Sequence, residues 1–193
     1  MNEQKKLFPD VKKGVNLVYN SLTLDEAKEL AKKICFTEHC FEELQVVGSI
    51  RRQKPIVRDI DFVVISNEWQ NLGKQLIAKL DALETMKGDK IKRFLVPTDK
   101  GAVQADFYRT TPKTWGVYML IRTGSAEHNV WLAKLALKNH MQLRYSVGLV
   151  ELPKGNVIAS DCEEDIFRSL GLDYINPTQR EMIGTIPAWM VKK

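Results

Sequence analysis

The sequence predicts an α+β protein, with a mixed or antiparallel sheet covered by helices on one face and a smaller α/β part after it. Three strand candidates lie at 59–65, 91–96 and 102–108, and side chains in the first and third follow the two-residue alternation of β-strands. Apolar residues spaced three and four apart, as in amphipathic helices, lie before, between and after these runs. We expect a lead-in at 1–22, a first domain at 23–111 and a second at 112–193.

The composition indicates a soluble globular protein. Of the 193 residues, 44% are hydrophobic and 27% are charged, and the net charge of +5 favours a polyanionic partner. Three cysteines without C-x-x-C spacing argue against a disulfide framework or structural zinc, and favour a reducing compartment. No apolar run approaches the roughly 20 residues of a membrane span, and the N-terminus is no signal peptide. We expect an intracellular monomer with no membrane partner.

The first domain opens with a helix. Thr23 and Glu26 form a capping-box pattern ahead of an apolar stripe that reaches Ile34. A short strand at 44–47 then leads into a turn at Gly48 and Ser49. After the strand at 59–65, Ser66 is expected to cap a long helix. Its apolar stripe comprises Trp69, Leu72, Leu76, Leu80 and Leu83.

The second domain is expected to begin with a helix at Thr111-Pro112, because proline is tolerated in a first turn. A further helix is expected at 126–140. Two short strands at 147–150 and 157–158 flank a hairpin-turn composition. A second capping-box pattern, Ser160 to Glu163, is expected to open a helix that ends at Gly171.

Three carboxylates are the candidate metal ligands. Asp59 and Asp61 stand two residues apart at the start of a strand, so their side chains point to the same face. Asp106 lies inside a neighbouring apolar strand. Carboxylates held this close repel one another, and shared divalent cations relieve the repulsion. Two such ions can serve in-line phosphoryl chemistry. Asp-x-Asp beside arginine, taken alone, also fits a structural ion-pair network.

Donors for phosphate oxygens precede these carboxylates. Backbone N–H groups near Gly48 and Ser49, with the guanidinium groups of Arg51 and Arg52, suit a polyphosphate. Metal ligands and phosphate donors from one stretch are the parts needed for phosphoryl or nucleotidyl transfer.

The pattern Gly48-Ser49-x-Arg51-Arg52, then Asp59-x-Asp61, then Asp106 resembles the nucleotidyltransferase palm, and more narrowly the family X DNA polymerases. Thr123-Gly124-Ser125 followed by Asn129 resembles the start of that family's thumb helix. The stretch from Glu163 to Glu181 resembles its C-terminal signature. The resemblance implies a palm at 23–111 and a thumb at 112–193. It is closest to a minimal palm-plus-thumb form without lyase and helix-hairpin-helix domains.

The resemblance also implies roles. Asp59, Asp61 and Asp106 would hold two Mg²⁺ ions, or Mn²⁺ in their place, with Asp106 beside the primer 3′-hydroxyl. The groups implied to bind the incoming nucleotide are Gly48, Ser49, Arg52, Arg58, Thr123, Gly124, Ser125 and Asn129. Basic residues are candidates for an electrostatic grip on gapped or primer-template DNA. They are Lys12, Lys13, Lys87, Lys90, Lys92, Arg93, Lys134 and Lys138.

The sequence departs from the family pattern in three places, one of them a pair of residues. Ile121-Arg122 replaces the usual aromatic pair before Thr-Gly-Ser, Ala133 replaces an arginine four residues after Asn129, and Gln104 replaces a basic residue two before Asp106. The expected function is template-directed, gap-filling DNA synthesis in DNA repair: dNMP is added to a primer 3′-hydroxyl by a two-metal mechanism with pyrophosphate release. The alternatives are a template-independent or ribonucleotide-tolerant nucleotidyltransferase and a non-catalytic DNA-end-binding module.

Overall fold

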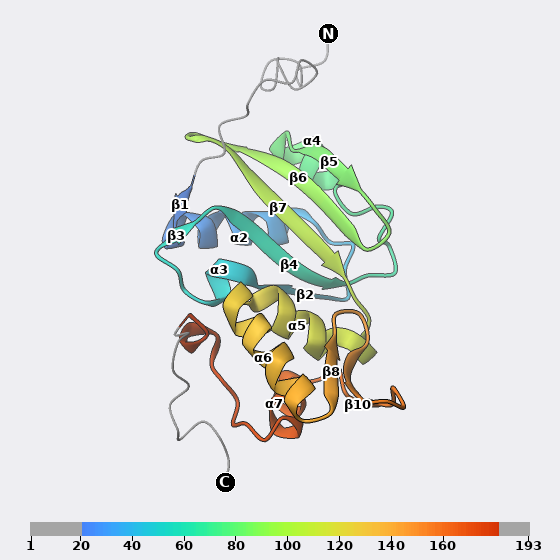
Figure 1. The fold of residues 1–193 in the computed structure, drawn as a ribbon. Helices are drawn as coiled ribbons and strands as arrows, with labels where there is room; N and C mark the ends of the chain where they lie inside the picture. The colour runs from blue at the N-terminus through green and yellow to red at the C-terminus, as the bar shows by residue number, and fades with distance from the viewer. Residues whose placement is uncertain (1–20, 182–193) are drawn as a thin grey trace. The chain divides into compact units, whose positions relative to one another are not determined.

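The computed structural model describes residues 21–181, which fall into two compact units (Figure 1). Unit 1 holds the described residues up to Leu44 together with Pro55–Arg109, and unit 2 holds Gln45–Lys54 and those from Thr110 onward. The predicted first domain, 23–111, therefore differs from unit 1 mainly in the segment Gln45–Lys54, which packs with unit 2.

A mixed five-stranded sheet, with strand order β2-β4-β7-β6-β5, forms the centre of unit 1. Strand β4 runs parallel to β7, while β6 is antiparallel to both β7 and β5. The strands are β2 (Glu43–Val46), β4 (Asp59–Ile65), β5 (Leu83–Lys87), β6 (Ile91–Thr98) and β7 (Gly101–Arg109). The predicted α+β class with a mixed sheet is confirmed.

Two helices and a small second sheet complete unit 1. Helix α2 (Leu24–Thr37) has the predicted capping box, in which the Thr23 hydroxyl accepts from the Glu26 N–H and the Glu26 carboxylate accepts from the Thr23 N–H. Short strands β1 (Leu22–Thr23) and β3 (Ile56–Val57) pair antiparallel. Helix α4 (Lys74–Leu80) contacts α2, and both lie on the same side of the large sheet (Figure 1).

The prediction of one long helix from Ser66 to Leu83 is wrong, because the helix in this region is α4, Lys74–Leu80. Residues before Lys74 form turns, in which Ser66 accepts from the Glu68 N–H at 3.1 Å. Asp81 adopts a left-handed backbone at φ 51° and ends α4, so Leu83 belongs to β5 and not to the helix. Trp69 is buried as expected, and its indole N–H donates to the Gly88 carbonyl at 2.9 Å.

Unit 2 packs helices against a three-stranded antiparallel sheet, order β10-β9-β8, and the predicted hairpin is confirmed as β9 and β10. Its helices are α3 (Gly48–Arg51), η2 (Pro112–Thr114), α5 (Trp115–Thr123), α6 (Ala126–Lys138), α7 (Glu163–Ser169) and η3 (Pro177–Gln179). Its strands are β8 (Met141–Arg144), β9 (Gly148–Glu151) and β10 (Val157–Ala159).

The second predicted capping box is wrong. Helix α7 begins at Glu163 with Cys162 at the cap position, and no side chain caps it. The Ser160 hydroxyl instead donates to the Lys113 carbonyl. Gly171 follows the helix with φ 73°, a left-handed conformation that suits glycine just after a helix end.

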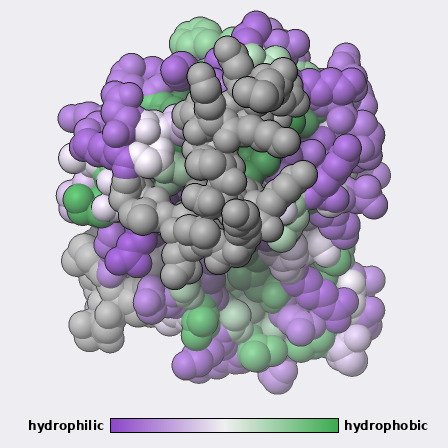
Figure 2. Space-filling view, turned by 90° about the horizontal axis from the view of Figure 1, so that it is seen from above, coloured by the Kyte–Doolittle hydropathy of each residue, from purple (hydrophilic) through white to green (hydrophobic). Residues whose placement is uncertain are grey.

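The core of unit 1 lies between its large sheet and its helices. The rings of Phe62 on β4 and Phe107 on β7 stack with centroids 4.7 Å apart, and Ile34 and Leu76 from the helices are fully buried. On the face in Figure 2, hydrophilic side chains cover much of the coloured surface. Among the described helices, none combines the length and apolarity needed to cross a bilayer.

Candidate functional site

The three candidate carboxylates lie on two adjacent strands of unit 1. Asp59 and Asp61 share one face of β4, because the residue between them, Ile60, is buried on the other. In the parallel pairing of β4 with β7, Asp61 stands directly opposite Asp106, and Asp59 stands opposite Gln104. The pairing therefore brings together carboxylates 45 positions apart in the chain.

Asp106 is the most enclosed of the three and accepts several hydrogen bonds. Its side chain is 3% exposed. The guanidinium of Arg93 binds both oxygens, with Nε at 2.7 Å from Oδ1 and Nη2 at 2.8 Å from Oδ2. Gln104 and the Tyr108 hydroxyl also donate to Oδ2, at 3.2 and 3.1 Å. The same hydroxyl lies 3.2 Å from Oδ1 of Asp61, so one tyrosine oxygen reaches two of the carboxylates.

The three carboxylates are chemically suited to bind a divalent cation. Carboxylate oxygens are the ligands that Mg²⁺ and Mn²⁺ prefer, and Asp59, Asp61 and Asp106 lie on neighbouring strands. Among the described residues, however, no group of three or more His, Cys, Asp or Glu side chains is already arranged around one metal position. Arg93 is the evident competitor, since its cationic fork takes both oxygens of Asp106.

The candidate phosphate-binding residues Gly48, Ser49 and Arg52 belong to unit 2, at helix α3. Gly48 has φ 61°, a left-handed backbone that favours glycine. The Ser49 hydroxyl is buried and has no hydrogen-bond partner among residues 21–181. A buried hydroxyl in that state is costly, and an oxygen-rich ligand would satisfy it.

Arg51, the last residue of α3, and Arg52, which follows it, are held by acidic residues of unit 2. Arg51 donates to the Thr123 hydroxyl at 2.6 Å and to Glu163 at 2.5 Å, and Glu163 also binds the buried Arg180 at 2.8 Å. Arg52 pairs with Glu181 and donates to the Thr123 carbonyl. These partners could not be predicted from the sequence, although Thr123, Glu163, Arg180 and Glu181 all lie in motifs that it contains.

Glu181 holds a second cation besides Arg52. Its carboxylate lies 3.1 Å from the ammonium of Lys54. Partial burial raises the pKa of Glu181, but hydrogen bonds from Arg52 and Lys54 outweigh it, and the net pKa is below the usual value. This carboxylate therefore stays ionised beside two cations that are suited to phosphate.

The turn at Thr123-Gly124-Ser125 is built into the packing of unit 2. Thr123 is fully buried. The Ser125 hydroxyl caps α6 by accepting from the His128 N–H at 3.3 Å, and it donates to the Arg180 carbonyl at 3.0 Å. The Asn129 amide donates to the Ile121 carbonyl at 2.8 Å, while its side-chain oxygen is buried without a partner. Within the described residues, Asn129 of this turn and Ser49 of α3 are the members of the predicted nucleotide-binding group that have a buried side-chain oxygen without a hydrogen-bond partner.

The basic residues proposed to grip DNA divide into several kinds. Lys87, Lys90, Lys134 and Lys138 are exposed, as is Arg58 of the nucleotide group. The assignment of Lys92 to a DNA surface is wrong, because it is 1% exposed and its ammonium donates to the Leu72 carbonyl at 2.9 Å. Burial lowers the pKa of this lysine. Lys12 and Lys13 lie outside the described residues.

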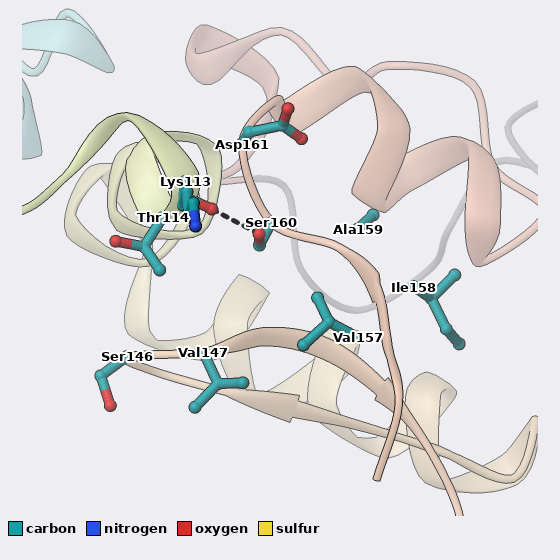
Figure 3. A pocket seen from close by; sticks show the side chains of 9 residues that line it. All are labelled: Lys113, Thr114, Ser146, Val147, Val157, Ile158, Ala159, Ser160 and Asp161. Atoms are coloured by element: carbon teal, nitrogen blue, oxygen red, sulfur yellow. Dashed lines mark hydrogen bonds between the residues drawn. The ribbon is translucent and has the colours of Figure 1, made fainter.

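Unit 2 also has a surface pocket of about 510 Å³, in which Val147, Val157 and Ile158 supply apolar walls (Figure 3). Lys113, Thr114, Ser146, Ala159, Ser160 and Asp161 complete its lining. None of these residues belongs to the candidate site, so the pocket adds nothing to the nucleotide assignment.

Comparison with known proteins supports the family resemblance. Residues 118–181 match the DNA polymerase beta thumb family. The chain is similar to the DNA polymerase/3′-5′ exonuclease PolX of Bacillus subtilis (strain 168), with 23% identity over 135 residues that cover 69% of this chain and 23% of that protein. It is also similar to the DNA nucleotidylexotransferase of Xenopus laevis, with 33% identity over 79 residues that cover 41% and 16%. The chain thus spans less than a quarter of either relative.

Proposed function

We propose that this chain, which resembles the family X DNA polymerases in its carboxylate motif and in its polymerase beta thumb, is a template-directed DNA polymerase that fills short gaps. The main support for the proposal is the pairing of β4 with β7. It places Asp61 opposite Asp106 on adjacent parallel strands, with Asp59 on the same face of β4 as Asp61. A deoxynucleotide would be joined to a primer 3′-hydroxyl, with release of pyrophosphate.

The carboxylates of unit 1 would hold two Mg²⁺ ions. When bound, such ions stabilise the charge that develops on the attacking and leaving oxygens of an in-line displacement. The protein's own task is to fix three acidic groups on a rigid sheet, and the pairing of β4 with β7 does this for Asp61 and Asp106.

The triphosphate would be bound by groups of unit 2. Its roughly four negative charges need donors and cations. The unsatisfied hydroxyl of Ser49 and the guanidinium of Arg52 are suited to this task. Because Arg52 is paired with Glu181, nucleotide binding has to compete with that carboxylate for Arg52.

The decisive experiment is primer extension on a one-nucleotide-gapped duplex with Mg²⁺. We expect incorporation of the nucleotide complementary to the template. Asp106→Asn should abolish it, a loss of at least 10²-fold, while affinity for the gapped duplex stays within about twofold. Asp89→Asn removes an exposed acid from a turn of the same unit and should leave the rate unchanged. Full activity of Asp106→Asn would disprove the metal-ligand assignment.

A second candidate function rests on Ile121 and Arg122, which stand where the family has an aromatic pair that screens the sugar. The Arg122 guanidinium lies 4.5 Å from the centre of the Tyr145 ring and contacts its hydroxyl. Template-independent or ribonucleotide-tolerant addition is tested in the same assay by omitting the template and by exchanging dNTP for rNTP. Binding to DNA ends without any incorporation would identify a non-catalytic binding module.

A further inference from the structure

We propose that Arg93 is a positioning residue for Asp106, and not a DNA-binding residue as its basic character suggests. The inference rests on the proposed function. Arg93 lies on β6 directly opposite Asp106 on β7, in the antiparallel register of the two strands. The contact is therefore set by backbone pairing between two central strands, and not by a chance meeting of flexible side chains.

The geometry of the contact fixes the carboxylate plane of Asp106. A guanidinium that binds two oxygens through two nitrogens defines both the distance and the orientation of its partner. The side chain of Arg93 is 34% exposed, whereas that of Asp106 is 3% exposed. Asp106 is almost fully removed from water. The guanidinium of Arg93 therefore compensates the Asp106 carboxylate for the hydration that burial takes away.

Arg93 also supplies the positive charge that Gln104, on the same strand as Asp106, does not. Gln104, two residues before Asp106, is neutral and makes a single hydrogen bond to Oδ2. The neighbouring strand thus provides the cation that β7 does not carry beside Asp106. A polar substitution at Gln104 should consequently matter less to Asp106 than any change at Arg93.

The four donors are shared unevenly between the two oxygens of Asp106. Among the described residues, Oδ2 accepts from Arg93, Gln104 and Tyr108, whereas Oδ1 accepts from Arg93 only. A carboxylate oxygen with three donors has little capacity left for another ligand. We infer that Oδ1 is the oxygen presented to a cation, and that Arg93 sets this choice by holding the carboxylate against Tyr108 and Gln104.

Arg93 should have two separable effects. Its positive charge opposes a nearby divalent cation and lowers metal affinity, an effect that any cation at this position would have in part. Its planar fork orients Asp106, an effect that the single ammonium of lysine cannot reproduce. Arg93→Gln removes both the charge and the fork, whereas Arg93→Lys removes only the fork.

The test measures Mn²⁺ binding to the full chain by electron paramagnetic resonance, and separately the single-turnover rate on gapped DNA. Arg93→Gln should bind Mn²⁺ about tenfold more tightly than the unchanged protein. Its rate should fall on the order of 10²-fold. Arg93→Lys should retain near-normal Mn²⁺ affinity with a similar loss of rate. The control Lys79→Gln removes one exposed charge from α4 of the same unit and should change neither quantity.

The results for the Arg93 variants distinguish a positioning role from a DNA contact and from failure of the proposed function. Loss of DNA affinity in Arg93→Gln with unchanged Mn²⁺ binding and rate would show that Arg93 is a DNA contact and would overturn the inference. Full rescue of the rate by Arg93→Lys would overturn the orienting role. Inactivity of the unchanged protein would defeat the proposed function, yet the Mn²⁺ measurement would still report on Arg93. Thermal melting of each variant, followed by circular dichroism, identifies a variant that fails to fold. If Arg93→Gln does not fold, the comparison of Arg93→Lys with the unchanged protein is the test.

Discussion

At the residue scale, the three carboxylates could be predicted from the sequence, whereas their immediate partners could not. The two-residue period of a strand is enough to put Asp59 and Asp61 on one face. Arg93 and Tyr108 become visible only when the pairing of β6 and β7 is known, because that register decides which side chains meet. The charge of Arg93 alone therefore suggests a DNA contact, whereas the strand register gives it Asp106 as a partner.

His128 on α6 is a second residue whose environment the sequence did not reveal. It is 3% exposed, and within residues 21–181 neither ring nitrogen makes a hydrogen bond of normal geometry. Its ring lies 5.9 Å from that of Phe167. Burial, and then the positive charge of Arg180, lower the pKa of His128 to about 3. The folded protein therefore requires this imidazole to be neutral.

This requirement predicts a loss of stability in mild acid. Above about pH 6.5 the imidazole is neutral in both the folded and unfolded states, so the stability is fully present. As the pH falls toward 3, the unfolded state takes up a proton that the folded state excludes. The free energy of unfolding should then fall by at most about 1.4 kcal/mol per pH unit. Urea denaturation at pH 7, 6 and 5 measures the slope.

His128→Leu is the matching control, since leucine is apolar and does not titrate. The slope between pH 7 and 5 should flatten in that variant. A slope that is unchanged by the substitution would assign the acid sensitivity to other groups. His39 and His140 are exposed and provide further controls as His39→Gln and His140→Gln, which should keep the full slope.

At the element scale, helices with a clear start signal and a continuous stripe were predicted well. Helix α2 has its capping box, and α6 covers most of the expected 126–140. The helix expected from Ser66 to Leu83 is too long. The turns before α4, the helix itself and the start of β5 all pack on one core, so the apolar spacing continues beyond both ends of the helix. The left-handed Asp81 marks the actual end, and no local pattern in the sequence predicts that conformation.

Helix α5 shows how close packing constrains one position. The N–H groups of Gly116 and Val117 donate to the carbonyls of Asp161 and Ser160, at 3.1 and 2.8 Å, so the first turn of α5 lies against the segment before α7. A Cβ atom on Gly116 would lie 2.4 Å from backbone atoms of Cys162. Backbone cannot move aside as a flexible side chain can.

We therefore predict that Gly116→Ala destabilises the protein by about 1–3 kcal/mol. Helix propensity alone predicts the opposite sign, since alanine is favoured over glycine in a helix by up to about 1 kcal/mol. The sign of the change in urea denaturation thus decides between the two effects. For comparison, a Cβ on Gly171 meets no atom within 4 Å, so Gly171→Ala should cost only the strain of its left-handed backbone, about 1–2 kcal/mol.

At the scale of the whole molecule, the sequence predicted the class of fold but not the membership of Gln45–Lys54. That segment begins within β2, yet its cations pair with Glu163 and Glu181, more than 110 positions later. Such pairings depend on long-range folding, and no local pattern reveals them. The same holds for the burial of Lys92, whose charge alone suggested a surface position.

The excess of positive charge leads to a prediction for DNA binding. A protein that neutralises phosphates releases counterions, so the logarithm of the binding constant falls with the logarithm of salt concentration by about 0.9 per phosphate contact. Lys134 and Lys138 are exposed on α6, one turn apart. If both contact phosphates, Lys134→Gln/Lys138→Gln should weaken binding to every duplex sequence and reduce the slope by about 2.

The matched control removes the same number of charges from another helix. Lys32 and Lys33 are exposed on α2 and lie outside the proposed DNA-binding set. Lys32→Gln/Lys33→Gln lowers the net charge equally, so it reproduces any effect of overall charge without removing a proposed contact. Fluorescence anisotropy of a labelled gapped duplex between 50 and 200 mM salt, a range over which phosphate contacts change affinity strongly, gives both slopes. Equal slopes for the two variants would mean that the net charge of the protein, and not the surface of α6, governs its attraction to DNA.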